Sequence, residues 1–137
     1  MFVYKHSGSG WVKVQSFSVD LDDWITLSVK NNQIKCCSSR NGKIAVYSLS
    51  GELLQTYGTR GCGNTGQLDW PYICADDDDG SVLIADRRNN RLQVMSEQGE
   101  FGVLQLQPPV SSPCSAVLIK NQLYVKPDWC IQLIKFI

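Results

Sequence analysis

The sequence predicts an all-β protein built from repeated four-stranded antiparallel sheets. Three observations support this prediction: a gap-free internal repeat, short apolar runs separated by turn residues, and no sustained 3.6-residue apolar period of the kind that indicates helices. A four-stranded unit of about 40–50 residues has the period of a β-propeller blade. The 137 residues hold the strands of about three such units, so we expect a partial propeller.

The repeat relates residues 34–53 to residues 82–101 without a gap, at an offset of 48 residues. The matched pairs include Ile34 with Val82, Arg40 with Arg88, Asn41 with Asn89, Ile44 with Leu92, Val46 with Val94, and Gly51 with Gly99. Chance gives one or two such matches and rarely all of them in one register. Two successive units of this chain therefore share one plan.

Each unit divides into strands at its turn residues. In the clearest unit the expected strands are Pro71–Asp76, Val82–Ala85, 92–94 and Phe101–Leu106, with turns at Asp79-Gly80, 87–90 and Gln98-Gly99. The preceding unit gives Trp24–Val29, Ile34–Cys37, Lys43–Tyr47 and Leu53–Tyr57, and the following one gives Cys114–Ile119, Gln122–Val125 and Cys130–Phe136. Val3-Tyr4 and Trp11–Phe17 match the last two strands of a further unit. We therefore expect the end of a blade at 1–20, blades at 21–60 and 61–108, and an incomplete blade at 109–137.

One unit carries a family motif as well as a strand pattern. Its residues are Gly51-Glu52, Tyr57-Gly58, Gly61, Gly63, Gly66-Gln67-Leu68, Pro71, Asp79-Gly80, Ile84-Ala85-Asp86, Asn89-Asn90-Arg91, Leu92-Gln93-Val94 and Gly99. This stretch resembles an NHL repeat, the unit of the six-bladed propeller at the C-terminus of many tripartite-motif (TRIM-NHL) proteins. The resemblance implies half of a six-bladed ring. It also implies a propeller that captures partners while a separate RING domain transfers ubiquitin.

We interpret most motif residues as structural. The glycines of the connection between blades, among them Gly58, Gly61 and Gly66, are expected to take positive φ values in a tight crossing. Asp86 and Arg91 flank a turn between adjacent strands, where opposite charges pair across the ladder. Further structural positions are Pro71, Asn90 and Gly99. Aromatic residues at strand positions, such as Trp11 and Tyr57, are expected to fill space between blades.

A candidate binding surface lies on the face that holds the connections between blades. It would gather Arg40, Arg60, Trp70, Arg87, Arg88, Lys126 and Trp129, with an indole for stacking. Asp20, Asp22, Asp23, Asp69 and Asp128 fall on the same face, which favours a mixed polar rim. A single-stranded RNA surface stays open as the alternative.

Catalytic and metal sites are not expected. Activation of a nucleophile usually needs a histidine base, and the single histidine, His6, lies in a Ser/Gly turn. The six cysteines form no CxxC pair, and in apolar strand runs we expect free thiols. The run Asp76–Asp79 before Gly80 reads as a solvated turn, because a calcium loop in that frame would begin at Ala75. We therefore predict no enzymatic activity, no cofactor and no metal.

The chain has 13 basic and 13 acidic residues, so its formal net charge is zero and no overall electrostatic attraction to nucleic acid or an anionic membrane is expected. No export signal or membrane-spanning apolar run is evident, so a cytoplasmic protein with no membrane partner is expected. The favoured function is a protein-interaction module, with RNA binding as the alternative and a decayed or fragmentary copy as the third reading. A ligase role would need a RING domain outside this chain. Closing the ring would need a homodimer or upstream blades.

Overall fold

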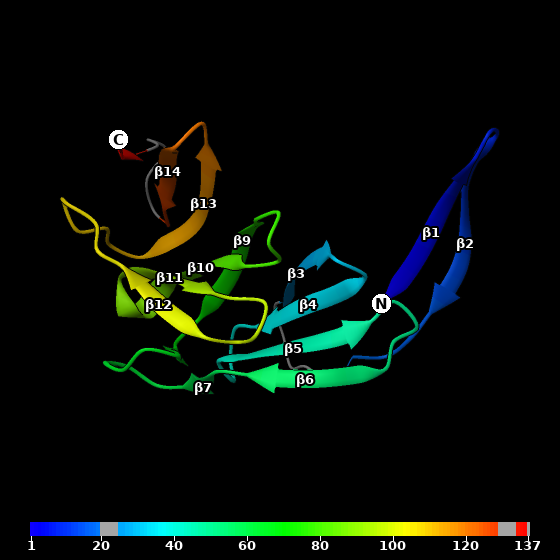
Figure 1. Ribbon diagram of the computed structural model, residues 1–137, viewed down its shortest axis with the longest axis horizontal. Coiled ribbons are helices and arrows are strands. Elements are labelled where there is room, and N and C mark those ends of the chain that lie inside the picture. Colours follow the sequence, from blue (N-terminus) through cyan, green and yellow to red (C-terminus); the bar gives the residue numbers. More distant parts are fainter. Residues whose placement is uncertain (20–24, 129–133, 137) are drawn as a thin grey trace.

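The computed structural model describes residues 1–19, 25–128 and 134–136. Figure 1 shows an all-β molecule in which sheets are stacked face to face, and the predicted antiparallel, four-stranded architecture is confirmed. Within these residues the only helical element is the three-residue 3-10 turn η1 (Arg87–Asn89). None of the described segments forms a helix long and apolar enough to cross a lipid bilayer.

The first sheet contains β3 (Ile25–Lys30), β4 (Gln33–Ser38), β5 (Lys43–Ser48) and β6 (Leu53–Tyr57), in that order. The middle sheet contains β9 (Pro71–Asp76), β10 (Val82–Asp86), β11 (Arg91–Met95) and β12 (Phe101–Leu104), also in chain order. Their registers repeat with the sequence: Lys35 pairs with Val46 in the first sheet, and Leu83 pairs with Val94 in the middle sheet. The offset of 48 residues is therefore a structural equivalence of β4–β5 with β10–β11.

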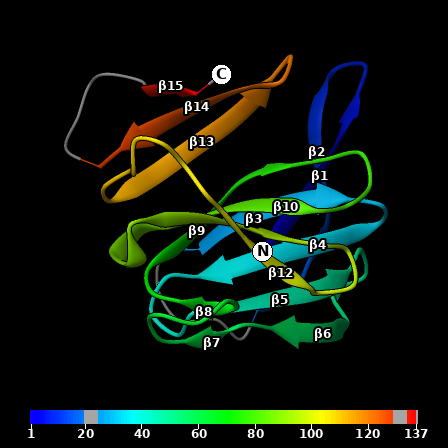
Figure 2. The same cartoon turned by 60° about the vertical axis from the view of Figure 1, so that its left-hand side comes forward.

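The third sheet has three described strands, β13 (Pro113–Ile119), β14 (Gln122–Pro127) and β15 (Ile134–Phe136). Figure 2 shows this sheet packed beside the middle sheet. The parallel pair β7 (Thr59–Arg60) and β8 (Gln67–Leu68) lies in the connection between the first and middle sheets. The expected residues 130–133 of the last strand lie outside the described part of the chain.

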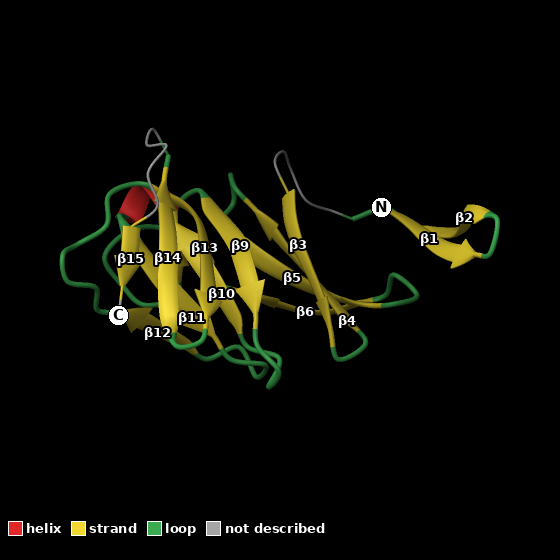
Figure 3. Cartoon of the chain, turned by 90° about the horizontal axis from the view of Figure 1, so that it is seen from above, coloured by secondary structure: helices red, strands yellow, loops and turns green. Residues whose placement is uncertain are grey.

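The N-terminal strands β1 (Phe2–Ser7) and β2 (Gly10–Ser16) pair only with each other among the described strands. Seen from above, this hairpin stands apart from the stacked sheets (Figure 3). The expectation that Trp11 fills space between blades is wrong, because the Trp11 side chain is 71% exposed on this hairpin. On this pair of strands Trp11 makes an edge-to-face contact with His6, with the ring centroids 5.2 Å apart, and no neighbouring sheet covers it among the described strands.

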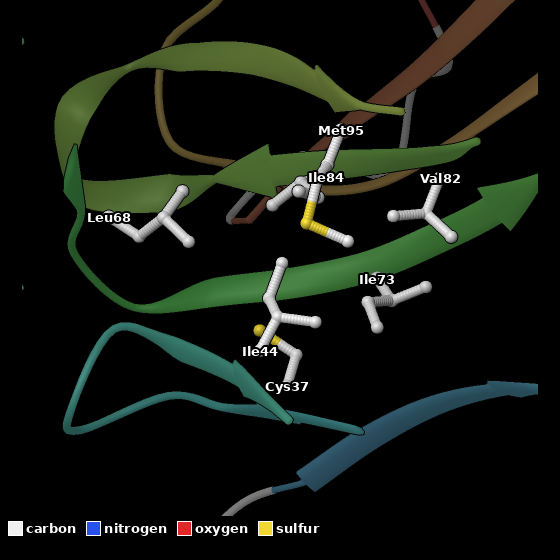
Figure 4. Packing of buried hydrophobic residues seen from close by; sticks show 7 residues of the cluster. All are labelled: Cys37, Ile44, Leu68, Ile73, Val82, Ile84 and Met95. Atoms are coloured by element: carbon white, nitrogen blue, oxygen red, sulfur yellow. The ribbon is translucent and has the colours of Figure 1, made fainter. Parts of the chain in front are cut away.

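Apolar residues form a separate core at each sheet contact. The first interface joins the first and middle sheets and contains Cys37, Ile44, Leu68, Ile73, Val82, Ile84 and Met95 (Figure 4). The second interface joins the middle and third sheets and contains Ala85, Leu92, Val110, Ala116 and Val125. Alternate residues of each strand face opposite interfaces, so the middle sheet contributes to both cores.

Polar side chains also connect the first and middle sheets at one rim of the stack. Lys30 Nζ donates to Asp78 Oδ1 at 2.8 Å, and Ser28 Oγ donates to Asp76 Oδ2 at 2.6 Å. The buried Lys35 ammonium donates to the carbonyl oxygen of Gly80. The acidic turn is therefore not simply solvated as the sequence indicated, because two of its carboxylates contact the neighbouring sheet.

Candidate interaction face

Trp70 and two arginines form a compact cluster where the connection between sheets enters β9. The Arg88 guanidinium carbon lies 4.6 Å from the Trp70 ring centroid, and that of Arg87 lies 5.6 Å away. Both distances are within the range of cation–π attraction. The sequence predicted Trp70, Arg87 and Arg88 on one face, and the structure places them together. We call these three residues the Trp70 cluster.

The backbone of Trp70 is held in an unusual conformation. Its φ of 54° lies in the left-handed region, which bulky side chains rarely adopt. The following residue, Pro71, is buried, and its ring further restricts the backbone conformations that Trp70 can adopt. Such strain persists only where surrounding contacts over-determine it. Hydrogen bonds to Asp86 provide such contacts, because one of them fixes Asp69, the residue before Trp70.

Asp86 is fully buried and serves as the anchor of this region. Its Oδ1 accepts the Asp69 backbone N–H at 2.8 Å, which fixes the residue before Trp70. Its Oδ2 accepts from Asn89 Nδ2 at 2.8 Å, Arg91 Nε at 2.9 Å and Gln93 Nε2 at 3.0 Å. The predicted pairing of Asp86 with Arg91 is confirmed, since the two residues face each other across β10 and β11.

The donors that contact Asp86 also hold the connection between the sheets. Arg91 Nη2 donates to the carbonyl oxygens of Asn64 and Gln67, each at 2.8 Å. Asn89 Nδ2 donates to the Gly61 carbonyl oxygen at 3.0 Å. Sequence reasoning gave no role to Asn89 or Gln93, although both lie in the motif. Their partners in the connection between the sheets, Gly61 and Gln67, are 26 to 28 residues away, which a local pattern does not reveal.

Two aspartates beside the Trp70 cluster partly neutralise its arginines. Arg87 forms an ion pair with Asp128, and Arg88 Nη1 lies 4.0 Å from Asp69 Oδ1. The Arg88 side chain is 53% exposed, against 21% for Arg87. The face therefore combines a half-buried indole, one largely exposed guanidinium and two partly exposed carboxylates. This mixture matches the expected polar rim more closely than a uniformly basic surface.

The other predicted surface residues are more scattered. Arg40 and Arg60 are exposed, and Arg60 pairs with Leu68 in the short parallel ladder that leads towards Trp70. The ammonium of Lys126 donates to the Cys114 sulfur at 3.4 Å. Trp129 lies outside the described residues, as do Asp20, Asp22 and Asp23.

The predicted structural glycines are mostly explained. Gly58 and Gly66 have φ values of 78° and 80°, as expected for the crossing between sheets. Gly61 does not have a positive φ, so its predicted reason is wrong; a Cβ there would instead lie 2.9 Å from the Gln67 side chain. Gly99 has a φ of 87° and packs directly against the Tyr57 ring. Asn90 takes a left-handed φ of 54°, and its Oδ1 accepts the Ser112 N–H at 2.8 Å.

A cleft of about 460 Å3 opens between the middle and third sheets, at the opposite rim from the Trp70 cluster. Its lining combines apolar residues with two residues of the acidic turn, and includes Ala75, Asp76, Asp77, Leu83, Val94, Leu104, Leu118, Asn121 and Leu123. Sequence reasoning missed this cleft. The internal repeat could have indicated it, because it aligns Lys35 with the shorter side chain of Leu83.

The thiols in the cores are shielded from ionisation. Burial raises the pKa of Cys36 to about 11 and that of Cys74 to about 11. Burial also raises the pKa of Cys37, and the neighbouring Cys74 and Asp86 raise it further. The five described cysteines are free, and Cys62 alone among them is exposed. Cys130 lies outside the described residues. No cluster of histidine, cysteine or acidic residues suited to a metal ion occurs in the described part of the chain.

Comparison with known proteins supports the fold. The NHL repeat model matches residues 73–95. Virginiamycin B lyase from Staphylococcus aureus is similar over 90% of this chain and 41% of its own, with 16% identity and a TM-score of 0.59. A streptogramin B lyase gives 18% identity and a TM-score of 0.60 over 90% of this chain and 40% of its own. No curated protein sequence is significantly similar to this chain.

A third structure extends the match. A catalytically inactive variant of the S. aureus virginiamycin B lyase, with quinupristin, has 14% identity and a TM-score of 0.61 over 98% of this chain and 48% of its own. This chain thus spans less than half the length of each lyase. The propeller-like fold is shared, and the sheets of this chain form an open stack.

These structures correct one prediction. We expected no enzymatic activity, because the chain has a single histidine and no recognisable catalytic array. That exclusion is wrong, because the solved structures that share the fold include lyases. At 14–18% identity the likeness carries the fold and no catalytic residue to this chain.

Proposed function

We propose that this chain is a protein-interaction module that engages its partner through the Trp70 cluster. The observation that carries the proposal is the indole of Trp70 held against Arg87 and Arg88 in a strained backbone conformation. Tryptophan and arginine are the residue types most enriched at the energetic centres of protein interfaces. Anchoring through Asp86 pre-organises the cluster, so less conformational entropy is lost on binding.

The electrostatics favour protein over nucleic acid as the ligand. A phosphate-binding surface gains affinity from uncompensated lysine and arginine side chains. Here Arg87 pairs with Asp128, and Arg88 lies beside Asp69. A partner surface with both an acidic group for Arg88 and a donor for Asp69 would satisfy this arrangement better than a uniformly anionic strand.

The wider context of the module is also a proposal. The NHL repeat at residues 73–95 supports a role like that of the partner-binding propeller in tripartite-motif ubiquitin ligases. In that setting this chain would select the partner, and a RING domain elsewhere would transfer ubiquitin. The open sheets would be completed by further blades or by a second copy of the chain.

Substitution of Trp70 tests the proposal, and the chain offers a matched control. Trp70→Ala should abolish co-purification of a partner and its direct binding to the purified chain, whereas Trp11→Ala should leave both unchanged. Trp11 is an exposed tryptophan on the separate hairpin, so it controls for loss of an indole alone. Circular dichroism should show that both variants keep the strand content. Retention of the partner by Trp70→Ala, with or without its loss by Trp11→Ala, would overturn the proposed site.

A further inference from the structure

The cleft between the middle and third sheets occupies a position that a lysine fills at the neighbouring interface. Lys35 of β4 pairs with Ser28 and Val46, and Leu83 of β10 pairs with Ala75 and Val94. Lys35 and Leu83 thus lie at equivalent positions of the central strands of β3–β5 and β9–β11, in successive sheets. Ala75, Leu83 and Val94 all line the cleft.

At the first interface the lysine closes the space. Lys35 is 1% exposed, and its ammonium reaches the next sheet to donate to the carbonyl oxygen of Gly80, in the turn between β9 and β10. Because the side chain is buried, its four-carbon stem is also removed from water between the two sheets. The first interface therefore has an aliphatic chain with a cationic end built into it.

At the second interface the equivalent side chain is shorter and uncharged. Leu83 is half-buried and cannot reach the turn between β13 and β14. Asn121 of that turn lines the cleft at the place that corresponds to Gly80. The space that Lys35 fills at one interface is thus open at the other, with apolar walls from Leu104, Leu118 and Leu123.

The charge at the cleft rim complements a cation. Asp76 and Asp77 are exposed and line the cleft, while Lys120, which precedes Asn121, is not among its lining residues. The Asp76 carboxylate is turned towards the first sheet, where it accepts from Ser28 Oγ at 2.6 Å, and Asp77 Oδ1 accepts the Asp78 N–H. Asp77 therefore has oxygen lone pairs left to receive an ammonium donor at the cleft.

We propose that this cleft binds a lysine side chain of a protein partner, whose stem packs on Leu83 and Leu104 while its ammonium meets Asp77 and the turn at Asn121. The inference deepens the proposed function, because it gives the partner a chemical feature. The volume of about 460 Å3 exceeds that of one lysine side chain, so an adjoining part of the same peptide also enters.

Binding of small probes to the complete chain tests the site without the partner. Nα-acetyl-lysine amide should shift the methyl resonances of Leu83, Leu104, Leu118 and Leu123 in a saturable way. Nα-acetyl-norleucine amide has the same stem without the charge and should shift them much less. Equal shifts with both probes would overturn the proposal, as would putrescine binding without binding of the blocked lysine.

Variants locate the two halves of the site. Leu83→Lys imitates Lys35 and should abolish binding of the lysine probe, because the chain then supplies its own ammonium. Asp77→Asn should weaken it about twofold to fivefold, as expected for loss of one exposed ion pair. Asp79→Asn is the matched control, since Asp79 belongs to the same turn but does not line the cleft. Wild-type affinity in both cleft variants would overturn the proposal.

The Trp70→Ala variant separates this site from the proposed function. It should bind the lysine probe as the wild type does, because the Trp70 cluster and the cleft lie at opposite rims of the stack. A Trp70→Ala variant that keeps its partner would contradict the proposed function alone. Absence of a specific lysine effect in the wild type would contradict the cleft alone.

Discussion

The Asp86 carboxylate accepts the Asp69 backbone N–H at 2.8 Å, and this bond joins the interior of the middle sheet to the start of the Trp70 cluster. The motif residues that looked purely structural therefore also position the surface residues. Loss of the bond would free the segment that carries Trp70 and release its left-handed conformation.

Asp86→Asn should destabilise the chain by about 2–4 kcal/mol, because an amide group would face the donors of Asn89, Arg91 and Gln93 and leave the Arg91 charge uncompensated. Urea unfolding followed by circular dichroism measures the change. Glu100→Gln, at an exposed turn position, controls for removal of one negative charge. Equal unfolding midpoints for Asp86→Asn and the wild type would contradict the anchoring role.

Gly99→Ala should destabilise the chain by about 2 kcal/mol or more, since the new Cβ would overlap the Tyr57 ring at a φ of 87°. Gly102→Ala, three residues later, is the control because its Cβ would meet nothing within 4 Å. Its effect should stay within about 1 kcal/mol. Thermal unfolding of the two variants compares them directly, and a similar loss in both would argue against this contact.

Alkylation by iodoacetamide at pH 8 should modify Cys62 first. With a pKa of about 11, Cys36 and Cys74 are ionised to about one part in a thousand at this pH. A raised thiol pKa means that folding loses stability as the pH rises above about 9, where the unfolded thiol ionises. Peptide mass spectrometry measures the order of labelling. Rapid labelling of Cys36 in the folded chain would show that the first sheet opens readily.

Any binding of a labelled single-stranded RNA should be weak and sensitive to salt, because the cluster arginines have acidic neighbours. Arg87→Glu with Arg88→Glu should abolish it, and Lys120→Glu on the opposite rim should not. Gel-shift titration at two salt concentrations measures the effect. Unchanged affinity in the double variant would exclude this face as an RNA surface.

The chain should self-associate at low micromolar concentration, because the open stack leaves apolar side chains and strand edges in water. Val117 and Ile119 of β13 are 43% and 52% exposed and alternate with residues of the second interface. Val117→Lys with Ile119→Lys should shift sedimentation towards the monomer. A sharp wild-type monomer near 15.3 kDa with cooperative unfolding would contradict this prediction.

Local patterns predicted much of the fold and less of the site. Strand limits such as Leu53–Tyr57 and Pro71–Asp76 follow from alternation and turn residues, which act over a few positions. The pair Asp86 and Arg91 was accessible for the same reason, since one turn separates them. The burial of Lys35 was not, because its acceptor Gly80 belongs to another sheet 45 residues away.

The difference between local patterns and long-range contacts also explains which properties of the hairpin and the cleft could be predicted. The strand character of β1 and β2 is local and was predicted, but their separation from the stacked sheets depends on what lies beside them. The cleft depends on how two sheets pack and on the length of one side chain, Leu83. Sequence periodicity identifies equivalent positions without revealing which of them leave space unfilled.

The middle sheet has a described sheet against each of its faces, whereas the first and third sheets each have one. In a stack held together by nearest-neighbour contacts, local opening proceeds from the ends inwards. Amide hydrogens of β10 and β11 should therefore exchange with deuterium most slowly, and those of β1 and β2 fastest. The unit with the strongest motif would then be the last part of the stack to open, after the units at both ends.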